Sequence, residues 1–214
     1  MSEVRTTKKE VVTAFRTGEI LAAARRLMER KGLDSLTMDE IAQAAGVAKG
    51  TLYLYFQSKD DLLQALLTQV GEAMALDLEA VLAAAESPPD KLRRVVALLL
   101  KYVEQERELF PVYLRELIRA KSNRKAVSPW IRKHEERIIG LLSRLFTEGM
   151  VSRQFIEVNP RLLAYLLKGM GRAVGYFQMT SDHPDAIQEA LPVVLRLLFS
   201  GIVLLPETPG EDAV

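Results

Sequence analysis

The sequence predicts an all-α protein of about nine helices, and three observations support this fold class. Almost every segment carries apolar residues at the helical period of about 3.6 residues. No segment shows the sustained alternation that half-buried strands require. Prolines stand near several expected helix starts, where their missing N–H group is harmless. They are Pro111, Pro129, Pro160 and Pro184.

The first helix is expected to end at Lys31, just before Gly32. Its inward face is the apolar stripe Ile20, Ala23, Ala24, Leu27 and Met28. A capping box from Thr37 to Glu40 then opens a short helix, because each side chain can bond to the backbone N–H of the other. The residues of this helix expected to face inward are Met38, Ile41, Ala42 and Ala45. Gly46 supplies the permissive backbone that a tight turn requires.

A third helix is expected from about Ala48 to Phe56, and Ser58 caps a long fourth helix with two aspartates in its first turn. The run SPPD at 87–90 breaks the chain. Further helices are expected at about 90–108, 111–121, 128–150, 160–180 and 184–204. Pro192 falls inside the last of these helices and is expected to kink it. The tail at 206–214 is expected to be disordered.

The composition predicts a cytoplasmic protein that does not enter the membrane. The chain has no cysteine, which excludes disulfides and thiolate metal sites and fits a reducing compartment. Its N-terminus lacks the apolar stretch of a signal peptide, and its apolar runs are far shorter than the roughly 20 residues that span a bilayer. The net charge is only +1, with a mild basic excess before residue 60.

The first three helices have the order and the turn of a helix-turn-helix, which lays a short helix in the major groove of DNA. On a helical wheel, Lys49, Gly50 and Tyr53 of the third helix cluster on one face, with Thr51 alongside. Lys49 can donate to guanine or to a phosphate, and Thr51 offers a hydroxyl to a phosphate and a methyl group to a thymine. Gly50 allows the backbone to approach the DNA closely. These residues are therefore candidate DNA contacts.

The aromatic residues of the third helix leave two interpretations open. Leu52 and Phe56 are interpreted as core residues. Tyr53 and Tyr55 can reach phosphate oxygens with their phenolic groups, but Tyr55 is equally consistent with packing in the core.

The stretch GLDSLTMDEIAQAAGVAKGTLYLYFQSKDDLL, within Ile20–Leu67, resembles the TetR family of transcriptional regulators. The match departs from the family at Tyr55, where histidine is common, and at Leu54, where tyrosine is frequent. The resemblance implies a DNA-binding domain at 1–64 and a helical ligand-binding and dimerisation domain at 65–205.

Other basic and polar residues around the helix-turn-helix are also candidate DNA contacts. Lys59 is similar to a lysine of the TetR family that contacts the DNA backbone, although it is also consistent with a solvated surface charge. Thr37 lies at a helix N-terminus, where free N–H groups attract an anion. A basic N-terminal arm is a further possibility. Its residues are Arg5, Lys8, Lys9 and Arg16.

The resemblance further implies a homodimer and a pocket for a small-molecule effector. Small residues at i, i+4 spacing are candidates for the dimer interface, and tight packing within one chain is the alternative. They are Gly169, Gly171, Ala173 and Gly175. The pocket candidates are Tyr102, Phe110, Tyr113, Trp130 and Tyr165. Aromatic residues at helical spacing are also typical of a core. An apolar or amphipathic effector is expected, with a cationic ligand or a long acyl chain both left open.

No constellation of residues predicts catalysis, a metal or a cofactor. His134-Glu135-Glu136 lacks the second histidine of a zinc-protease motif, and Gly169-Met-Gly171 lacks both the spacing and the preceding strand of a nucleotide loop. The helix-turn-helix predicts a DNA-binding regulator, and the resemblance to the TetR family implies one that binds a palindromic operator as a dimer, most simply a repressor relieved by a ligand. The alternatives are a corepressed regulator or activator, and a helical ligand-binding module that does not bind DNA.

Overall fold

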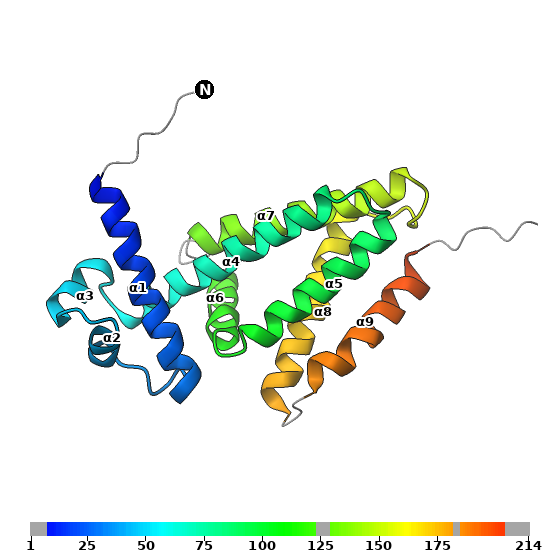
Figure 1. Ribbon diagram of the computed structural model, residues 1–214. Coiled ribbons are helices and arrows are strands. Elements are labelled where there is room, and N and C mark those ends of the chain that lie inside the picture. Colours follow the sequence, from blue (N-terminus) through cyan, green and yellow to red (C-terminus); the bar gives the residue numbers. More distant parts are fainter. Residues whose placement is uncertain (1–7, 123–128, 182–184, 204–214) are drawn as a thin grey trace, which may run out of the picture.

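The computed structural model describes residues 8–122, 129–181 and 185–203, and within these ranges the chain forms α-helices and no strand. This confirms the all-α prediction. Figure 1 shows α1–α3 at one end of the molecule and α5 and α7–α9 at the other, with α4 leading from one to the other and α6 between them. The helices are α1 (Lys8–Lys31), α2 (Met38–Ala44), α3 (Lys49–Tyr55), α4 (Lys59–Ala83), α5 (Pro88–Gln105), α6 (Phe110–Ser122), α7 (Pro129–Val151), α8 (Pro160–Thr180) and α9 (Ala186–Gly201).

The turns between the first helices follow from local chemistry. Gly32 and Gly46 adopt φ values of 77° and 66°, in the left-handed region that favours glycine. Thr37 and Glu40 form the predicted capping box, and Ser58 accepts from the backbone N–H of Asp61 at the start of α4. These turns and caps set the directions in which α2, α3 and α4 begin.

α1, α2, α3 and the first half of α4 enclose one apolar cluster, which we call the head core. Ile41 and Leu52 are fully buried within it. The contribution of α4 comes from Leu62, Leu63, Leu66 and Leu67. Leu109, just before α6, and Val112 within α6 complete the cluster. The predicted domain boundary near residue 64 therefore falls within a continuous helix, so the position of this boundary remains a prediction.

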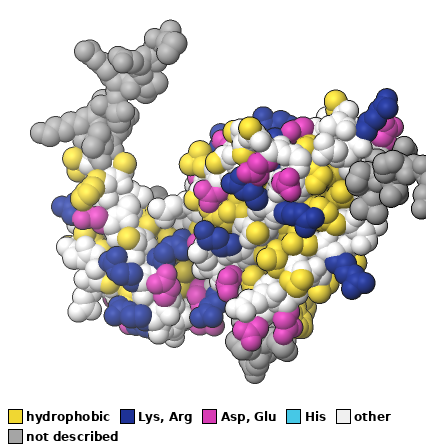
Figure 2. Space-filling model, turned by 45° about the vertical axis from the view of Figure 1, so that its right-hand side comes forward, with side chains coloured by type: hydrophobic (Ala, Val, Ile, Leu, Met, Phe, Trp, Pro, Cys, Tyr) yellow, Lys and Arg dark blue, Asp and Glu magenta, His cyan; other side chains and the backbone are white. Residues whose placement is uncertain are grey.

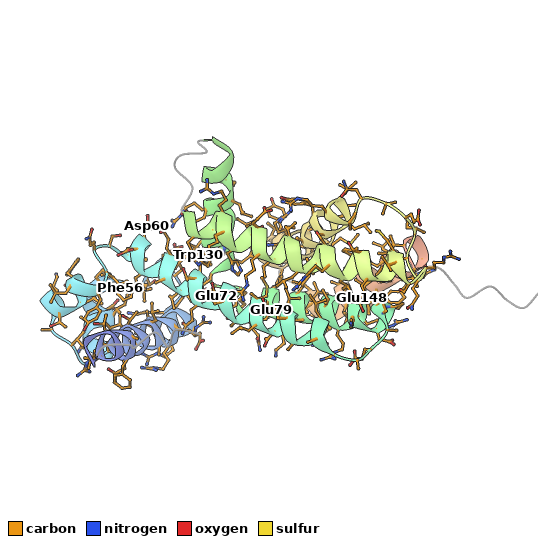
Figure 3. The ribbon with its side chains drawn as sticks, turned by 90° about the horizontal axis from the view of Figure 1, so that it is seen from above. Phe56, Asp60, Glu72, Glu79, Trp130 and Glu148 are labelled. Atoms are coloured by element: carbon orange, nitrogen blue, oxygen red, sulfur yellow. The ribbon has the colours of Figure 1, made fainter. Side chains whose placement is uncertain are left out.

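The second half of α4 belongs to a separate cluster, the body core, which α5 and α7–α9 complete. α5 packs against α4, α7, α8 and α9. Seen from above, α4 and α7 run side by side, with Glu72 and Glu79 lying along α4 (Figure 3). The Arg137 guanidinium of α7 donates to both carboxylates, at 2.6 and 3.0 Å. Polar and apolar contacts thus join these two helices along their shared length.

Some boundaries differ from those predicted. α9 begins at Ala186 and ends at Gly201, which makes it shorter than the predicted 184–204 helix. After it, the Ile202 carbonyl accepts from Ile156 N–H at 2.9 Å, an interaction between distant segments that no local pattern indicates. Pro192 lies inside α9 as predicted. The predicted disordered tail at 206–214 lies outside the described residues.

The predicted basic arm is largely part of α1. Lys8 and Lys9 begin this helix, and the Arg16 guanidinium pairs with Glu19 one turn later, at 2.9 Å. Arg5 lies outside the described residues. None of the helices within the described ranges is long and apolar enough to cross a membrane.

We expect Gly149→Ala in α7 to destabilise the protein by about 1–3 kcal/mol, because inserting a methyl group into a packed core forces its neighbours to shift. A Cβ at position 149 would lie 2.1 Å from a ring carbon of Phe155, which is 1% exposed and packs on Phe146. The free energy of unfolding in urea measures the effect.

Gly140→Ala is the matched control, because it lies on the same helix and a Cβ there would meet no atom within 4 Å. Its effect should be neutral or stabilising, by up to about 1 kcal/mol from helix propensity. Equal stability of the two variants would contradict the expected collision with Phe155.

Candidate functional site: an exposed short helix and a cavity in the body

α3 buries one side chain fully and presents most of the others to solvent. Leu52 is fully buried in the head core, whereas Lys49, Gly50 and Tyr53 are exposed. Leu54, on the same short helix, is 85% exposed. A Cβ on Gly50 would meet no atom within 4 Å, so packing within the chain does not require glycine there. The predicted cluster of Lys49, Gly50 and Tyr53 on one face of α3 is therefore accessible to a binding partner.

Lys49 forms an exposed ion pair with Asp39 of α2, at 2.7 Å. The hydrogen bond to this carboxylate, together with its charge, raises the pKa of Lys49, which stays protonated at neutral pH. Exposed pairs of this kind add little stability, so the ammonium group can exchange Asp39 for another anion at small cost.

The other predicted DNA contacts are partly engaged within the head. The Thr37 hydroxyl donates to Glu40 at 2.8 Å, and Thr37 remains exposed. Tyr55 is half-buried and packs against the head core, which favours the packing interpretation. Thr51 is also half-buried. The Lys59 ammonium donates to the Leu33 carbonyl at 2.7 Å and holds the α1–α2 turn against α4. Sequence reasoning did not identify this internal role of Lys59.

A cavity of about 130 Å³, partly open to solvent, lies where α4, α5, α6, α7 and α8 meet. Four of the five predicted pocket residues line it: Tyr102, Phe110, Tyr113 and Trp130. Tyr165 does not line it. This side chain is 45% exposed on the outer side of α8, with the Arg161 guanidinium 5.7 Å from its ring centre. The prediction for Tyr165 was therefore wrong, because an aromatic residue at helical spacing can equally face outward.

The predicted set of small residues on α8 divides between two sides of the helix. Gly171 lines the cavity, and a Cβ on Gly175 would lie 2.5 Å from the Phe110 ring. Gly175 therefore allows packing within the chain, which favours that alternative over a dimer interface for this residue. A Cβ on Gly171 would meet no atom within 4 Å, so packing within the chain does not require glycine there. Gly169 is half-buried and Ala173 is exposed, so these two remain available to a partner.

The cavity wall contains charged residues that the sequence did not single out for it. Lys168, 7% exposed, forms an ion pair with Glu135, which also accepts from the Tyr113 hydroxyl at 3.0 Å. Burial and the Glu135 charge raise the pKa of Tyr113, and burial lowers the pKa of Lys168 against the opposing effect of Glu135. Arg172 also lines the cavity, and its charge opposes the rise in the pKa of Tyr113. The i, i+4 spacing of Lys168 and Arg172 could have indicated a shared face.

Trp130 and His134 form a second polar feature of the wall. Their rings stack with centres 5.2 Å apart. The Trp130 Nε1 atom and both His134 ring nitrogens are buried and have no hydrogen-bond partner among the described residues. The His134 ring also lies against the backbone of α4, because a Cβ on Gly71 would come within 2.5 Å of it. Buried donors of this kind require an acceptor that the described part of the chain does not supply.

Glu106 links the cavity to the head. It lines the cavity at the end of α5 and accepts from the Arg25 guanidinium of α1 at 2.6 Å. Away from the cavity, Asp60, in the first turn of α4, pairs with Arg115 of α6 at 3.0 Å. Side chains at the cavity are therefore directly connected to the helices that carry α3.

Comparison with known proteins identifies the class and then the family. Residues 20–66 match the model for bacterial regulatory proteins of the tetR family, and residues 85–176 match the model for the tetracyclin repressor-like C-terminal domain. A helix-turn-helix followed by such a domain defines a DNA-binding transcriptional regulator. The chain belongs to the TetR family.

Relatives support this assignment over most of the chain. The HTH-type regulator YhgD of Bacillus subtilis is 23% identical over 178 residues, covering 83% of this chain and 91% of the relative. The FadR regulator of B. subtilis, solved in complex with stearoyl-CoA, has a TM-score of 0.69 at 25% identity, covering 86% of this chain and 98% of that one. A protein of Saccharomonospora viridis, solved with choline, has a TM-score of 0.74 at 20% identity, covering 90% and 100%, and shows the fold alone.

These relatives are regulators and not enzymes, which confirms the prediction that this chain is not an enzyme. Within the described ranges, histidine and carboxylate side chains form no group that could hold a metal ion.

We expect His134 to titrate below pH 6.5, because burial and the nearby Lys168 charge lower its pKa. The unfolded chain then binds a proton that the folded chain does not. The contribution of His134 to the free energy of unfolding is therefore fully present above the pKa of the unfolded chain. It is lost as the pH falls through 6.5 toward the pKa of the folded chain.

The measurement is an NMR titration of a His183→Asn variant, in which His134 is the remaining imidazole of the two that the chain contains. Urea unfolding between pH 7 and pH 5.5 should show the accompanying loss of stability. A folded pKa at or above 6.5 would contradict the desolvated environment inferred for this ring.

Proposed function

We propose that this regulator binds a palindromic operator as a homodimer, represses transcription and releases the DNA when a small molecule occupies the cavity. The observation that carries the proposal is the double role of α4. Its residues Leu63 and Leu66 lie in the head core, and Val70, Gly71 and Met74 line the cavity a few residues further along. A ligand that shifts this wall also shifts the helix on which the head is built.

The exposed face of α3 supports direct reading of DNA. Lys49 and Tyr53 are accessible, Gly50 leaves the backbone open, and Thr51 lies beside them. Two such helices in a dimer would enter successive major grooves about 34–36 Å apart. Small rotations of the two heads would change this separation, so binding would be sensitive to the position of α4.

An apolar outer face on α8 and α9 supports dimerisation. In Figure 2, hydrophobic side chains gather on the right-hand side of the body, the side on which α9 lies in Figure 1. Leu162 and Leu166 of α8 are 56% and 52% exposed, and Val193 and Leu197 of α9 are 57% and 60% exposed. Gly169 and Ala173 are also on α8. Exposed apolar patches of this kind mark interaction surfaces, and most homo-oligomers bury the same patch on both subunits.

The direct test is selection of bound sequences from random duplex DNA at near-physiological salt. Enrichment of a palindrome supports a dimeric, sequence-specific regulator and provides the probe for ligand titrations. A ligand that strengthens rather than weakens binding would favour a corepressed regulator. No enrichment, together with an affinity that does not depend on salt, would favour a module that does not bind DNA.

Lys49→Ala and Tyr53→Ala are each expected to weaken binding to the selected operator about tenfold or more, since a base or phosphate contact is worth roughly 1–3 kcal/mol. Their unfolding free energies should stay near the parent value, because both side chains are exposed. Fluorescence anisotropy with labelled operator gives the affinities. Lys101→Ala, an exposed lysine on α5, removes the same charge far from α3 and should bind normally. Normal binding by both α3 variants would exclude this assignment.

Leu166→Arg is expected to convert the dimer to monomer, because the substitution places two like charges in one apolar interface. Analytical ultracentrifugation at micromolar concentration measures the association state, and operator affinity should fall with it. Leu76→Arg on α4 is the matched control, since Leu76 is 60% exposed and lies on another helix. A dimer that survives Leu166→Arg but not Leu76→Arg would place the interface elsewhere.

A further inference from the structure

We propose that the effector of this regulator is a compact organic anion, a carboxylate on one ring or a short chain, whose charge Arg172 and Lys168 hold at the cavity wall. The inference rests on the proposed function, because it names the chemistry of the ligand that the cavity receives. Size, unpartnered donors and the distribution of charge each point to this class.

The size of the cavity limits the ligand. Its volume is about 130 Å³. Apolar protein cavities of about 150 Å³ accommodate a molecule such as benzene. A single ring or a chain of a few carbons therefore fits within this volume, whereas most of a long acyl chain would have to lie outside it. The walls are largely apolar and aromatic, including Met74, Leu99 and Phe110, so the body of the ligand is hydrophobic.

The unpartnered polar atoms of the wall favour a hydrogen-bond acceptor. The indole Nε1 of Trp130 can only donate, and a neutral imidazole donates through one nitrogen. Both side chains line the cavity, and the Trp130 Nε1 and His134 nitrogens are buried without a partner among the described residues. A carboxylate offers two acceptor oxygens to such donors, whereas a quaternary ammonium offers none.

The charges in the wall favour an anion. Both acidic residues that line the cavity are already engaged, since Glu106 pairs with Arg25 and Glu135 pairs with Lys168. Arg172 makes no ion pair within the described part of the chain, and its guanidinium has five N–H donors arranged to match a carboxylate. Lys168 has three donor protons and can use one on Glu135 and another on the ligand.

The aromatic wall would also suit a cation, but the distribution of charge in the wall favours an anion. Quaternary ammonium ligands bind over rings such as Tyr102, Tyr113 and Trp130, which all line the cavity. The charges of Lys168 and Glu135 offset one another, so Arg172 supplies the positive charge that remains at the wall. This charge repels a cation and attracts an anion, so the wall discriminates between ligands by the sign of their charge.

The test uses Trp130 as the reporter, since it is the only tryptophan in the chain. The full-length protein is titrated at pH 7 with sodium benzoate and sodium hexanoate, which are ionised at this pH, while tryptophan fluorescence is followed and calorimetry provides the stoichiometry. Benzyl alcohol and benzylamine are the neutral and cationic ring analogues, and choline and stearoyl-CoA test the other two ligand classes. We expect at least one carboxylate to bind about tenfold more tightly than either ring analogue.

Arg172→Gln should weaken carboxylate binding about tenfold and leave benzyl alcohol binding unchanged, whereas Arg172→Lys should recover part of the loss. Arg161→Gln is the matched control, because Arg161 lies exposed on the same helix and the substitution removes the same charge. It should bind the carboxylates as the parent protein does. A general loss of folding would lower the binding of benzyl alcohol as well.

Benzylamine or choline binding more tightly than the carboxylates would overturn the proposal, and so would binding of stearoyl-CoA alone. The absence of binding by any probe would also overturn it. Carboxylate binding that Arg172→Gln leaves unchanged would do the same. These titrations contain no DNA, so their results do not depend on whether the protein binds an operator. Stearoyl-CoA that binds and releases the operator would overturn the compact anion but support ligand-relieved repression. A carboxylate that binds without changing operator affinity would support the ligand class and contradict that repression mechanism.

Discussion

The burial of α4 in two separate apolar cores is the constraint on which the rest of the structure depends. Leu66 lies in the head core and Leu78 in the body core, about 18 Å apart along one continuous helix. The head cannot turn relative to the body without bending α4 or repacking one of the cores. Gly71 lies between the two, where His134 packs against the bare backbone. Any change at this ring therefore acts on the middle of the connecting helix.

Two features of the cavity wall reduce fold stability in comparison with a wholly apolar core. The Lys168–Glu135 pair is removed from water, and replacing such pairs with apolar residues is often neutral or stabilising. Trp130 and His134 add buried nitrogen atoms that lack partners among the described residues. Fold stability alone gives no reason for the buried ion pair or the unpartnered nitrogen atoms, whereas a polar ligand would supply hydrogen-bond partners for them. Glu106 then matters because it belongs to the same wall and holds Arg25 of α1.

The head could be predicted from sequence because short-range rules determine it. The Thr37 capping box and the turn at Gly46 each depend on residues within a few positions along the chain, and both were confirmed. The burial of Leu52 follows from the helical period alone. The bonding of Lys59 to Leu33 could not be predicted in this way, because the two residues meet only when α4 folds back beside the α1–α2 turn.

The sequence by itself determined the class of the fold and the helix-turn-helix, because helical period and capping chemistry are local. Only the tertiary structure decided which side of α8 faces inward. Small residues such as Gly175 suit contact within a chain or between chains equally well, and the Phe110 ring that occupies this site comes from a distant helix. Tyr165 was misplaced for the same reason. The pairing of charges at the cavity wall also depends on the tertiary structure, since Lys168 and Glu135 meet only where α8 packs against α7.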